Sequence, residues 1–111
     1  MDRRPGDAAR RLQQGFGTNG SRVTQVDYAQ SANGTAEGSF RLTGDRDWSE
    51  YNAAGQPLFR FVEAQRDEWS VHLTDSQRPV RVQLDLHTRR VNYSDSANPV
   101  PRKLYDLVDA R

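Results

Sequence analysis

The chain has no cysteine, so it can form neither a disulfide framework nor a thiolate metal site. It also has no isoleucine, and hydrophobic residues make up only 34% of its 111 positions, which is a small supply for a core. A fold of this size must then be held by packing alone or share an apolar face with a second copy. We therefore expect a compact domain that is a candidate homodimer.

A strong charge of either sign is also missing, because 16 basic and 15 acidic residues leave a formal net charge of +1. This balance favours neither nucleic acid nor an anionic membrane as a partner. No apolar run is long enough to span a bilayer, and the first residues lack the apolar stretch of a signal peptide. We expect a soluble protein without a visible export signal, whose cellular location stays open.

Residues for metal or nucleotide chemistry are equally sparse. His72 and His87 are the two histidines, and their spacing matches no metal-binding motif. The glycine-rich segment 15–20, GFGTNG, lacks the Lys-Ser/Thr of a phosphate-binding loop and the preceding strand of a dinucleotide fold. We expect no cofactor and no bound metal.

What the chain does contain is a series of short β-prone runs separated by turn residues. These runs are 22–29, 36–44, 45–51, 57–64, 67–74, 79–87 and 89–94. The short turns between them favour antiparallel neighbours. The pattern predicts an all-β antiparallel meander of six or seven strands, arranged as a small barrel or half-sandwich. Residues 103–110 fit a helix or a strand, with a slight preference for a strand.

Residues 1–21 differ from this pattern and contain few apolar side chains that could be buried. Asp7 can cap two helical turns, which the glycines at 15, 17 and 20 would end. We expect a flexible or short-helical arm over 1–21 and a single β domain over 22–111.

The segment EYNAAGQPLFRF, residues 50–61, resembles one unit of the Tyr-Asp-x-x-Gly-x-Leu rhythm of bacterial RHS/YD-repeat proteins. In those proteins each unit is a strand–turn–strand element of a large secreted shell. Asn52 stands where that family usually has Asp. The resemblance covers one unit and implies a hairpin at this place in the chain.

The stretch 66–87 alternates apolar and polar residues almost without interruption. Pairing Trp69 with Leu84, Val71 with Val82 and Leu73 with Val80 places the apolar residues of this hairpin on one face. The same logic pairs Phe59 and Phe61 with the strand that follows them, and Val91 and Tyr93 with the strand before them. The predicted core is Phe59, Phe61, Trp69, Val71, Leu73, Val80, Val82, Leu84, Leu86, Val91 and Tyr93.

The opposite face of this predicted sheet carries donors and acceptors across several strands. Its polar groups, with one exposed aromatic ring, suit the hydroxyls and flat faces of a sugar. The candidate ligand-binding residues are Trp48, Tyr51, Arg60, Ser70, His72, Arg81, Gln83, Asp85 and Asn92. We expect His72 to lie opposite Arg81.

Three classes of function remain open. The first is a non-catalytic, lectin-like module that binds a glycan or another small polar ligand on this face. The second is an oligomerising or interaction domain, such as one associated with a secreted toxin or shell protein. The third is a small enzyme that uses His72 and Asp85, although no nucleophile motif accompanies them.

Overall fold

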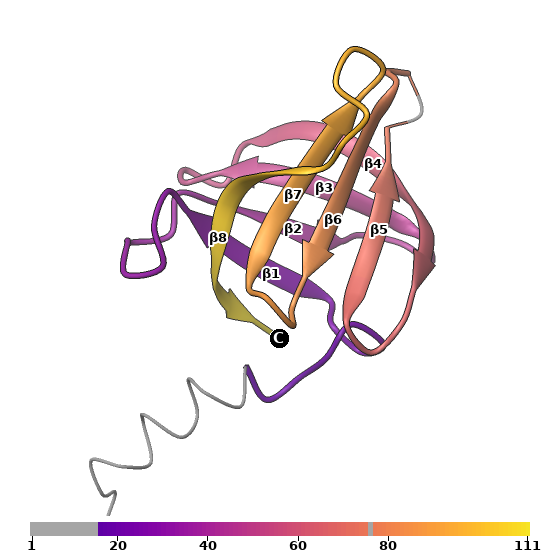
Figure 1. The fold of residues 1–111 in the computed structure, drawn as a ribbon. Coiled ribbons are helices and arrows are strands. Elements are labelled where there is room, and N and C mark those ends of the chain that lie inside the picture. Colours follow the sequence, from indigo (N-terminus) through magenta and orange to yellow (C-terminus); the bar gives the residue numbers. More distant parts are fainter. Residues whose placement is uncertain (1–15, 76) are drawn as a thin grey trace, which may run out of the picture.

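The computed structural model describes residues 16–75 and 77–111, and in them the chain forms an all-β, closed antiparallel barrel (Figure 1). Its strands follow one another around the barrel in sequence order. They are β1 (Gln25–Ala29), β2 (Gly38–Leu42), β3 (Asp47–Asn52), β4 (Pro57–Arg66), β5 (Ser70–Thr74), β6 (Val80–Asp85), β7 (Arg90–Asp95) and β8 (Arg102–Ala110). The predicted meander and barrel are confirmed, with eight strands in place of six or seven.

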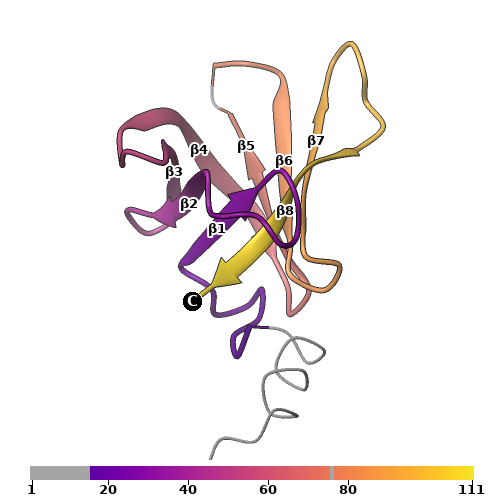
Figure 2. The ribbon, with the colours of Figure 1, turned by 90° about the vertical axis from the view of Figure 1, so that its left-hand side faces the viewer.

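The eighth strand closes the barrel, since β8 pairs with both β7 and β1. The tail of the chain is therefore a strand, in agreement with the preference that its sequence indicated. Closure gives the first and last strands a partner and so removes the free edges that an open sheet would present. Figure 2 shows β8 crossing beside β1 near the C-terminus.

The interior of the barrel is filled by side chains. Trp48, Phe40, Leu73 and Leu84 are among the largest fully buried residues, and they come from strands on different sides of the barrel. Small closed barrels of eight strands have an interior just wide enough for such packing. The interior is thus a core, and ligands must be sought on the outer face or at the barrel ends.

The register of the strands differs from the predicted one. Val71 pairs with Leu84 and Leu73 with Val82, a shift of two residues from the expected partners. The turn after β5 is centred one residue later in the chain than the predicted register places it, because Asp75 N–H donates to the carbonyl of Val80. A shift of two preserves which face each side chain occupies, since the side-chain period of a strand is two.

The prediction that Phe59 and Trp69 belong to the core is wrong, because both side chains are about half exposed. The pairing of β4 with β5 begins only at Val62, so Phe59 lies on a part of β4 that extends past its neighbour. Trp69 lies before β5, in the turn at the end of the barrel. In the alternating pattern both residues fall on the same face as the core residues, but neither side chain lies inside the barrel.

The turn of the β3–β4 hairpin forms where the resemblance implied it. Asn52 Oδ1 accepts hydrogen bonds from the N–H groups of Ala54 and Gln56. Gly55 has a φ of 82°, a left-handed conformation that glycine adopts without strain. The sequence Asn-Ala-Ala-Gly therefore encodes this turn locally.

The segment before β1 covers the lower end of the barrel in Figure 1. Val23 is fully buried, Phe16 packs against the core, and Gly20 N–H donates to the carbonyl of Glu68. Residues 16–21, which the sequence assigned to an arm, thus pack on the barrel. The predicted helical turns around Asp7 lie outside the described residues.

Candidate functional site

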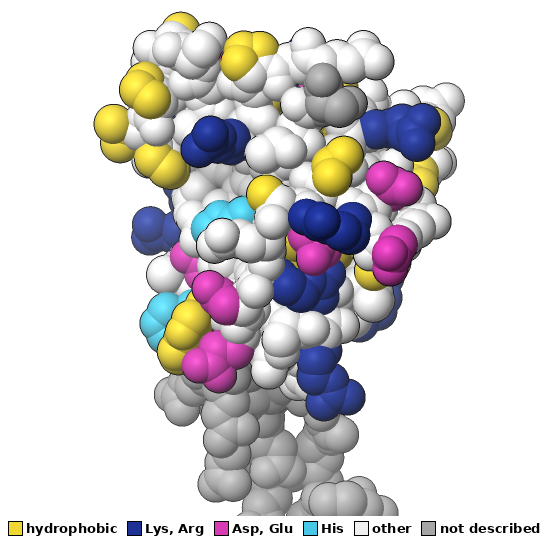
Figure 3. Space-filling view, turned by 90° about the vertical axis from the view of Figure 1, so that its right-hand side faces the viewer, with side chains coloured by type: hydrophobic (Ala, Val, Ile, Leu, Met, Phe, Trp, Pro, Cys, Tyr) yellow, Lys and Arg dark blue, Asp and Glu magenta, His cyan; other side chains and the backbone are white. Residues whose placement is uncertain are grey.

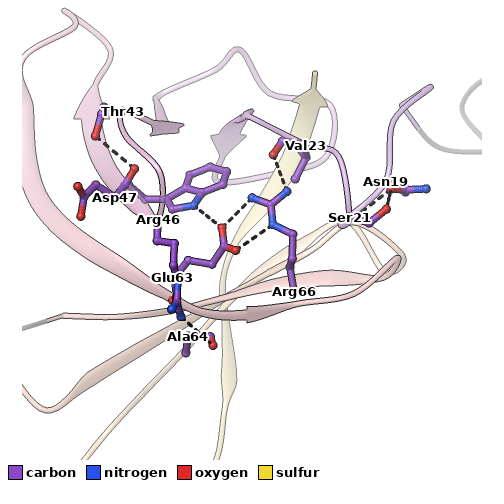
Figure 4. A network of polar contacts seen from close by, with 10 residues as sticks. Asn19, Ser21, Val23, Thr43, Arg46, Asp47, Glu63, Ala64 and Arg66 are labelled. Atoms are coloured by element: carbon purple, nitrogen blue, oxygen red, sulfur yellow. Dashed lines mark hydrogen bonds and ion pairs between the residues drawn. The ribbon is translucent and has the colours of Figure 1, made fainter.

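The lower interior holds a polar network that centres on Glu63 (Figure 4). Trp48 Nε1 donates to Glu63 Oε1 at 3.0 Å, and Arg66 Nη2 donates to the same oxygen at 2.7 Å. A second nitrogen of Arg66 donates to the carbonyl of Val23 at 3.2 Å. The guanidinium of Arg66 holds the pKa of Glu63 below its usual range.

This network corrects the role predicted for Trp48. The ring of Trp48 is fully buried and its N–H is already bonded to Glu63. It therefore cannot serve as an aromatic surface for a ligand on the outer face. The network ties β3, β4 and the segment before β1 together, which is a structural role.

A second buried pair joins Tyr28 of β1 and Glu50 of β3. Tyr28 Oη donates to Glu50 Oε2 at 2.6 Å, and the ring of Tyr105 stacks on Tyr28 with centroids 4.1 Å apart. Burial raises the pKa of both Glu50 and Tyr28. Sequence reasoning missed this pair, although each residue stands at an inward-facing position of its strand.

The outer faces of β5, β6 and β7 carry a row of polar side chains. His72 lies opposite Gln83, and Gln83 lies opposite Asn92 on the next strand. Asn92 Nδ2 donates to Gln83 Oε1 at 3.2 Å, and Gln83 Nε2 donates to Ser70 Oγ at 2.9 Å. These bonds hold the amide groups in fixed orientations across three strands.

This row forms the floor of a groove of about 460 Å³. Pro99 and Pro101, from the loop between β7 and β8, form one wall. Ala64 and Gln65, at an irregularity in the pairing of β4 with β5, contribute to the groove as well. Its full lining is Ala64, Gln65, His72, Leu73, Thr74, Arg81, Val82, Gln83, Asn92, Ser94, Pro99 and Pro101.

Of the predicted site residues, the groove brings together His72, Arg81, Gln83 and Asn92. His72 faces Gln83 across the strands, so its predicted pairing with Arg81 is wrong. The corrected register places Arg81 one row higher, opposite Thr74 and Ser94. An even shift in register kept all four residues on the same face.

Ser70 and Asp85 lie one row below the groove floor, opposite each other. Ser70 is buried and accepts the bond from Gln83, so it supports the floor. Asp85 Oδ1 accepts bonds from the N–H groups of His87 and Thr88 and holds the turn after β6. The Asp85 carboxylate is therefore hydrogen-bonded to the backbone of this turn.

The other predicted residues lie elsewhere on the barrel. Tyr51 packs under the guanidinium of Arg41, with 4.7 Å from the carbon of that group to the ring centroid. Arg60 lines a separate groove on β4. Sequence reasoning missed the proline walls, although the motif Asn-Pro-Val-Pro at 98–101 is a signal of a rigid loop.

The groove is lined by hydrogen-bond donors and carries no acidic side chain. None of its lining residues is an aspartate or glutamate, whereas Arg81 contributes an exposed guanidinium. The amide groups of Gln83 and Asn92 can both donate and accept. A ligand rich in hydroxyl or carboxylate oxygens complements this lining.

No known protein family, curated protein or solved structure matches the chain. Among residues 16–75 and 77–111, no group of three or more histidine or carboxylate side chains could hold a metal ion. The same part of the chain contains no helix long and apolar enough to cross a membrane.

Proposed function

We propose that this protein is a non-catalytic binding module whose outer groove takes a small polar ligand, with carbohydrate as the ligand class. The observation that supports this most directly is the row of His72, Gln83 and Asn92 on the groove floor, where hydrogen bonds hold the two amide groups in place. Amide groups that are held in place can bracket hydroxyl groups without a large cost in side-chain entropy, and the imidazole of His72 adds a further polar group beside them.

The walls and size of the groove support the same proposal. Ligand sites combine apolar walls with a few placed polar groups, and Pro99 and Pro101 supply the apolar part here. Arg81 at the upper end adds a cation that can meet a carboxylate or several hydroxyl groups. A sugar, and above all a sugar acid, satisfies these donors.

The test is an NMR titration of the protein with glucose and with glucuronic acid. Binding in the groove predicts coupled shifts of the His72, Gln83 and Asn92 signals, with glucuronic acid the tighter ligand. Arg81→Ala should then weaken glucuronic acid by about tenfold, the loss of roughly one charge-assisted hydrogen bond.

Arg60→Ala is the matched control, because Arg60 is an exposed arginine on the outer face but outside the groove. It should bind both sugars as the unaltered protein does. If the shifts fall outside β5, β6 and β7, or if both arginine variants lose binding equally, the groove is not the site.

A second candidate, an interaction domain that associates with another chain or with itself, rests on a different observation. Leu58, Phe59 and Val62 of β4 are exposed by 39–45% and line one groove. Exposed apolar clusters often mark interfaces between proteins. Sedimentation velocity on the unaltered protein and on Val62→Lys tests it, because a β4-mediated homodimer should dissociate in the variant.

A further inference from the structure

Trp69 is the exposed tryptophan of this barrel, with 52% of its surface accessible. Its backbone is fixed on both sides, because Trp69 N–H donates to Asp67 Oδ1 at 2.8 Å and its carbonyl accepts from Leu86 N–H at 2.9 Å. The ring of His87 meets the indole edge to face, with centroids 4.5 Å apart and planes at 73°. The indole is therefore oriented in advance while much of it stays open to water.

The position of Trp69 relates it to the groove. Trp69 directly precedes Ser70, whose hydroxyl supports Gln83 on the groove floor. His72, on that floor, is three residues further along the strand, which corresponds to about 10 Å. The row between them consists of Ser70, which is buried, and Asp85, which is partly exposed.

The groove lies over the middle of β5, and Trp69 directly precedes the same strand. Figure 3 shows imidazole side chains in two separate places on one face of the molecule, one of them beside a hydrophobic group. Cationic and anionic side chains are interspersed over the rest of the view.

Resting on the proposed function, we propose that Trp69 is a second subsite and that the ligand is an oligosaccharide. One sugar unit occupies the groove over His72, Gln83 and Asn92, and a further unit of the same chain stacks on Trp69. The C–H face of a pyranose ring is apolar, whereas its rim carries hydroxyl groups. An open indole near a groove lined by polar groups matches both parts of such a ring.

A purely structural role for Trp69 accounts less well for its exposure. An aromatic side chain of this size contributes to folding through the area that it buries, and Trp69 leaves about half of that area in water. Trp48 shows the alternative within the same chain, fully buried and hydrogen-bonded. The structure therefore gives the two tryptophans different environments, one suited to the core and one to a ligand.

The experiment measures binding of glucose, cellotetraose and maltotetraose to the full chain by NMR, with the two indole N–H signals followed separately. The unaltered protein should bind one of the tetrasaccharides about tenfold more tightly than glucose, which is the scale of one added stacking contact. The Trp69 indole should shift with that tetrasaccharide, while the buried Trp48 indole serves as the internal reference.

Trp69→Ala should reduce tetrasaccharide affinity to that of glucose and leave glucose affinity unchanged, whereas Trp69→Phe should keep part of the gain. Thermal unfolding of each variant checks that the fold is retained. Equal losses for glucose and tetrasaccharide, or no loss at all, would overturn the role of Trp69 and leave the groove proposal standing.

The failure of the groove proposal has a different signature. If no sugar shifts the His72, Gln83 and Asn92 signals, the proposed function is wrong and the two-subsite ligand is wrong with it. If a tetrasaccharide shifts the Trp69 indole while the groove signals stay fixed, Trp69 binds alone and the two-subsite arrangement is overturned.

Discussion

At the scale of single residues, Glu50 shows how the barrel treats an acid in its interior. It occupies an inward-facing position on β3, between Phe40 on β2 and Phe59 on β4. Burial raises the pKa of Glu50 and outweighs the hydrogen bond from Tyr28 and the charge of Arg78, which both lower it. The folded state therefore favours the protonated form of this carboxyl more than the unfolded state does.

The stability that Glu50 contributes should follow from that direction. A group with a raised pKa in the folded state contributes fully below its ordinary pKa of 4.5 and loses the contribution as the pH rises through the folded value. Glu50→Gln keeps an acceptor for Tyr28 and cannot ionise. We expect the variant to match the unaltered protein near pH 4 and to unfold at a higher temperature at pH 8.

Calorimetric melting temperatures at the two pH values check this prediction. Tyr28→Phe is the control, because it removes the donor to Glu50 and leaves the carboxyl buried. It should be less stable than the unaltered protein at both pH values. A Glu50→Gln protein that melts below the unaltered protein at pH 8 would show that the charged carboxylate is favourable there.

At the scale of elements, close approach between neighbouring strands depends on Gly38. This residue lies on β2, opposite Tyr28 on β1 and Asn52 on β3. A methyl group at Gly38 would overlap the hydroxyl of Tyr28 and press on the carbonyl of Tyr51. The glycine therefore provides the space in which Tyr28 reaches Glu50.

We expect Gly38→Ala to lower the free energy of unfolding by about 2 kcal/mol, in the usual range for a side chain forced into a packed site. Urea titration followed by circular dichroism measures the change. Gly44→Ala is the control, because a methyl group there would meet only the end of the Asp47 side chain. A loss at Gly38 no larger than that at Gly44 would mean that Tyr28 moves aside freely.

The pairing of the strands also shows what the alternating pattern cannot predict, which is the register between neighbouring strands. Alternation places Val71, Leu73, Val82 and Leu84 on one face for any register that differs by two residues. The pattern could therefore predict the core face and the polar face, but not that His72 would lie opposite Gln83. For this reason the pattern placed His72, Arg81, Gln83 and Asn92 on one face, while their rows had to come from the structure.

At the scale of the whole molecule, the strand that closes the barrel buries a leucine almost as completely as a strand far from the closure does. Leu107 on β8 is 2% exposed, and it pairs with Tyr28 across the closure. Leu84, on central strand β6, is 0% exposed. Because each strand of a closed barrel has two partners, loss of packing at the closure should weaken the whole fold.

We therefore expect Leu107→Ala and Leu84→Ala each to cost about 3 kcal/mol, the usual cost of truncating a buried leucine. Leu104→Ala, on the same strand but 41% exposed, should cost well under half of that. Urea midpoints with an unchanged slope measure all three. If Leu107→Ala costs no more stability than Leu104→Ala, β8 packs only loosely on the barrel. The closure would then not unfold cooperatively with the other strands.

The alternating pattern determined that this chain is all-β and antiparallel and which face of the 66–87 hairpin is apolar. The turn residues Asn52 to Gly55 determined where the turn between β3 and β4 forms. These features depend on side-chain period and local hydrogen bonds, which are properties of neighbouring residues. The tertiary structure decided which strands close the barrel and how far each extends past its partner. It therefore also decided that Trp48 is buried while Trp69 is exposed, because both have inward parity and only Trp48 lies within the barrel.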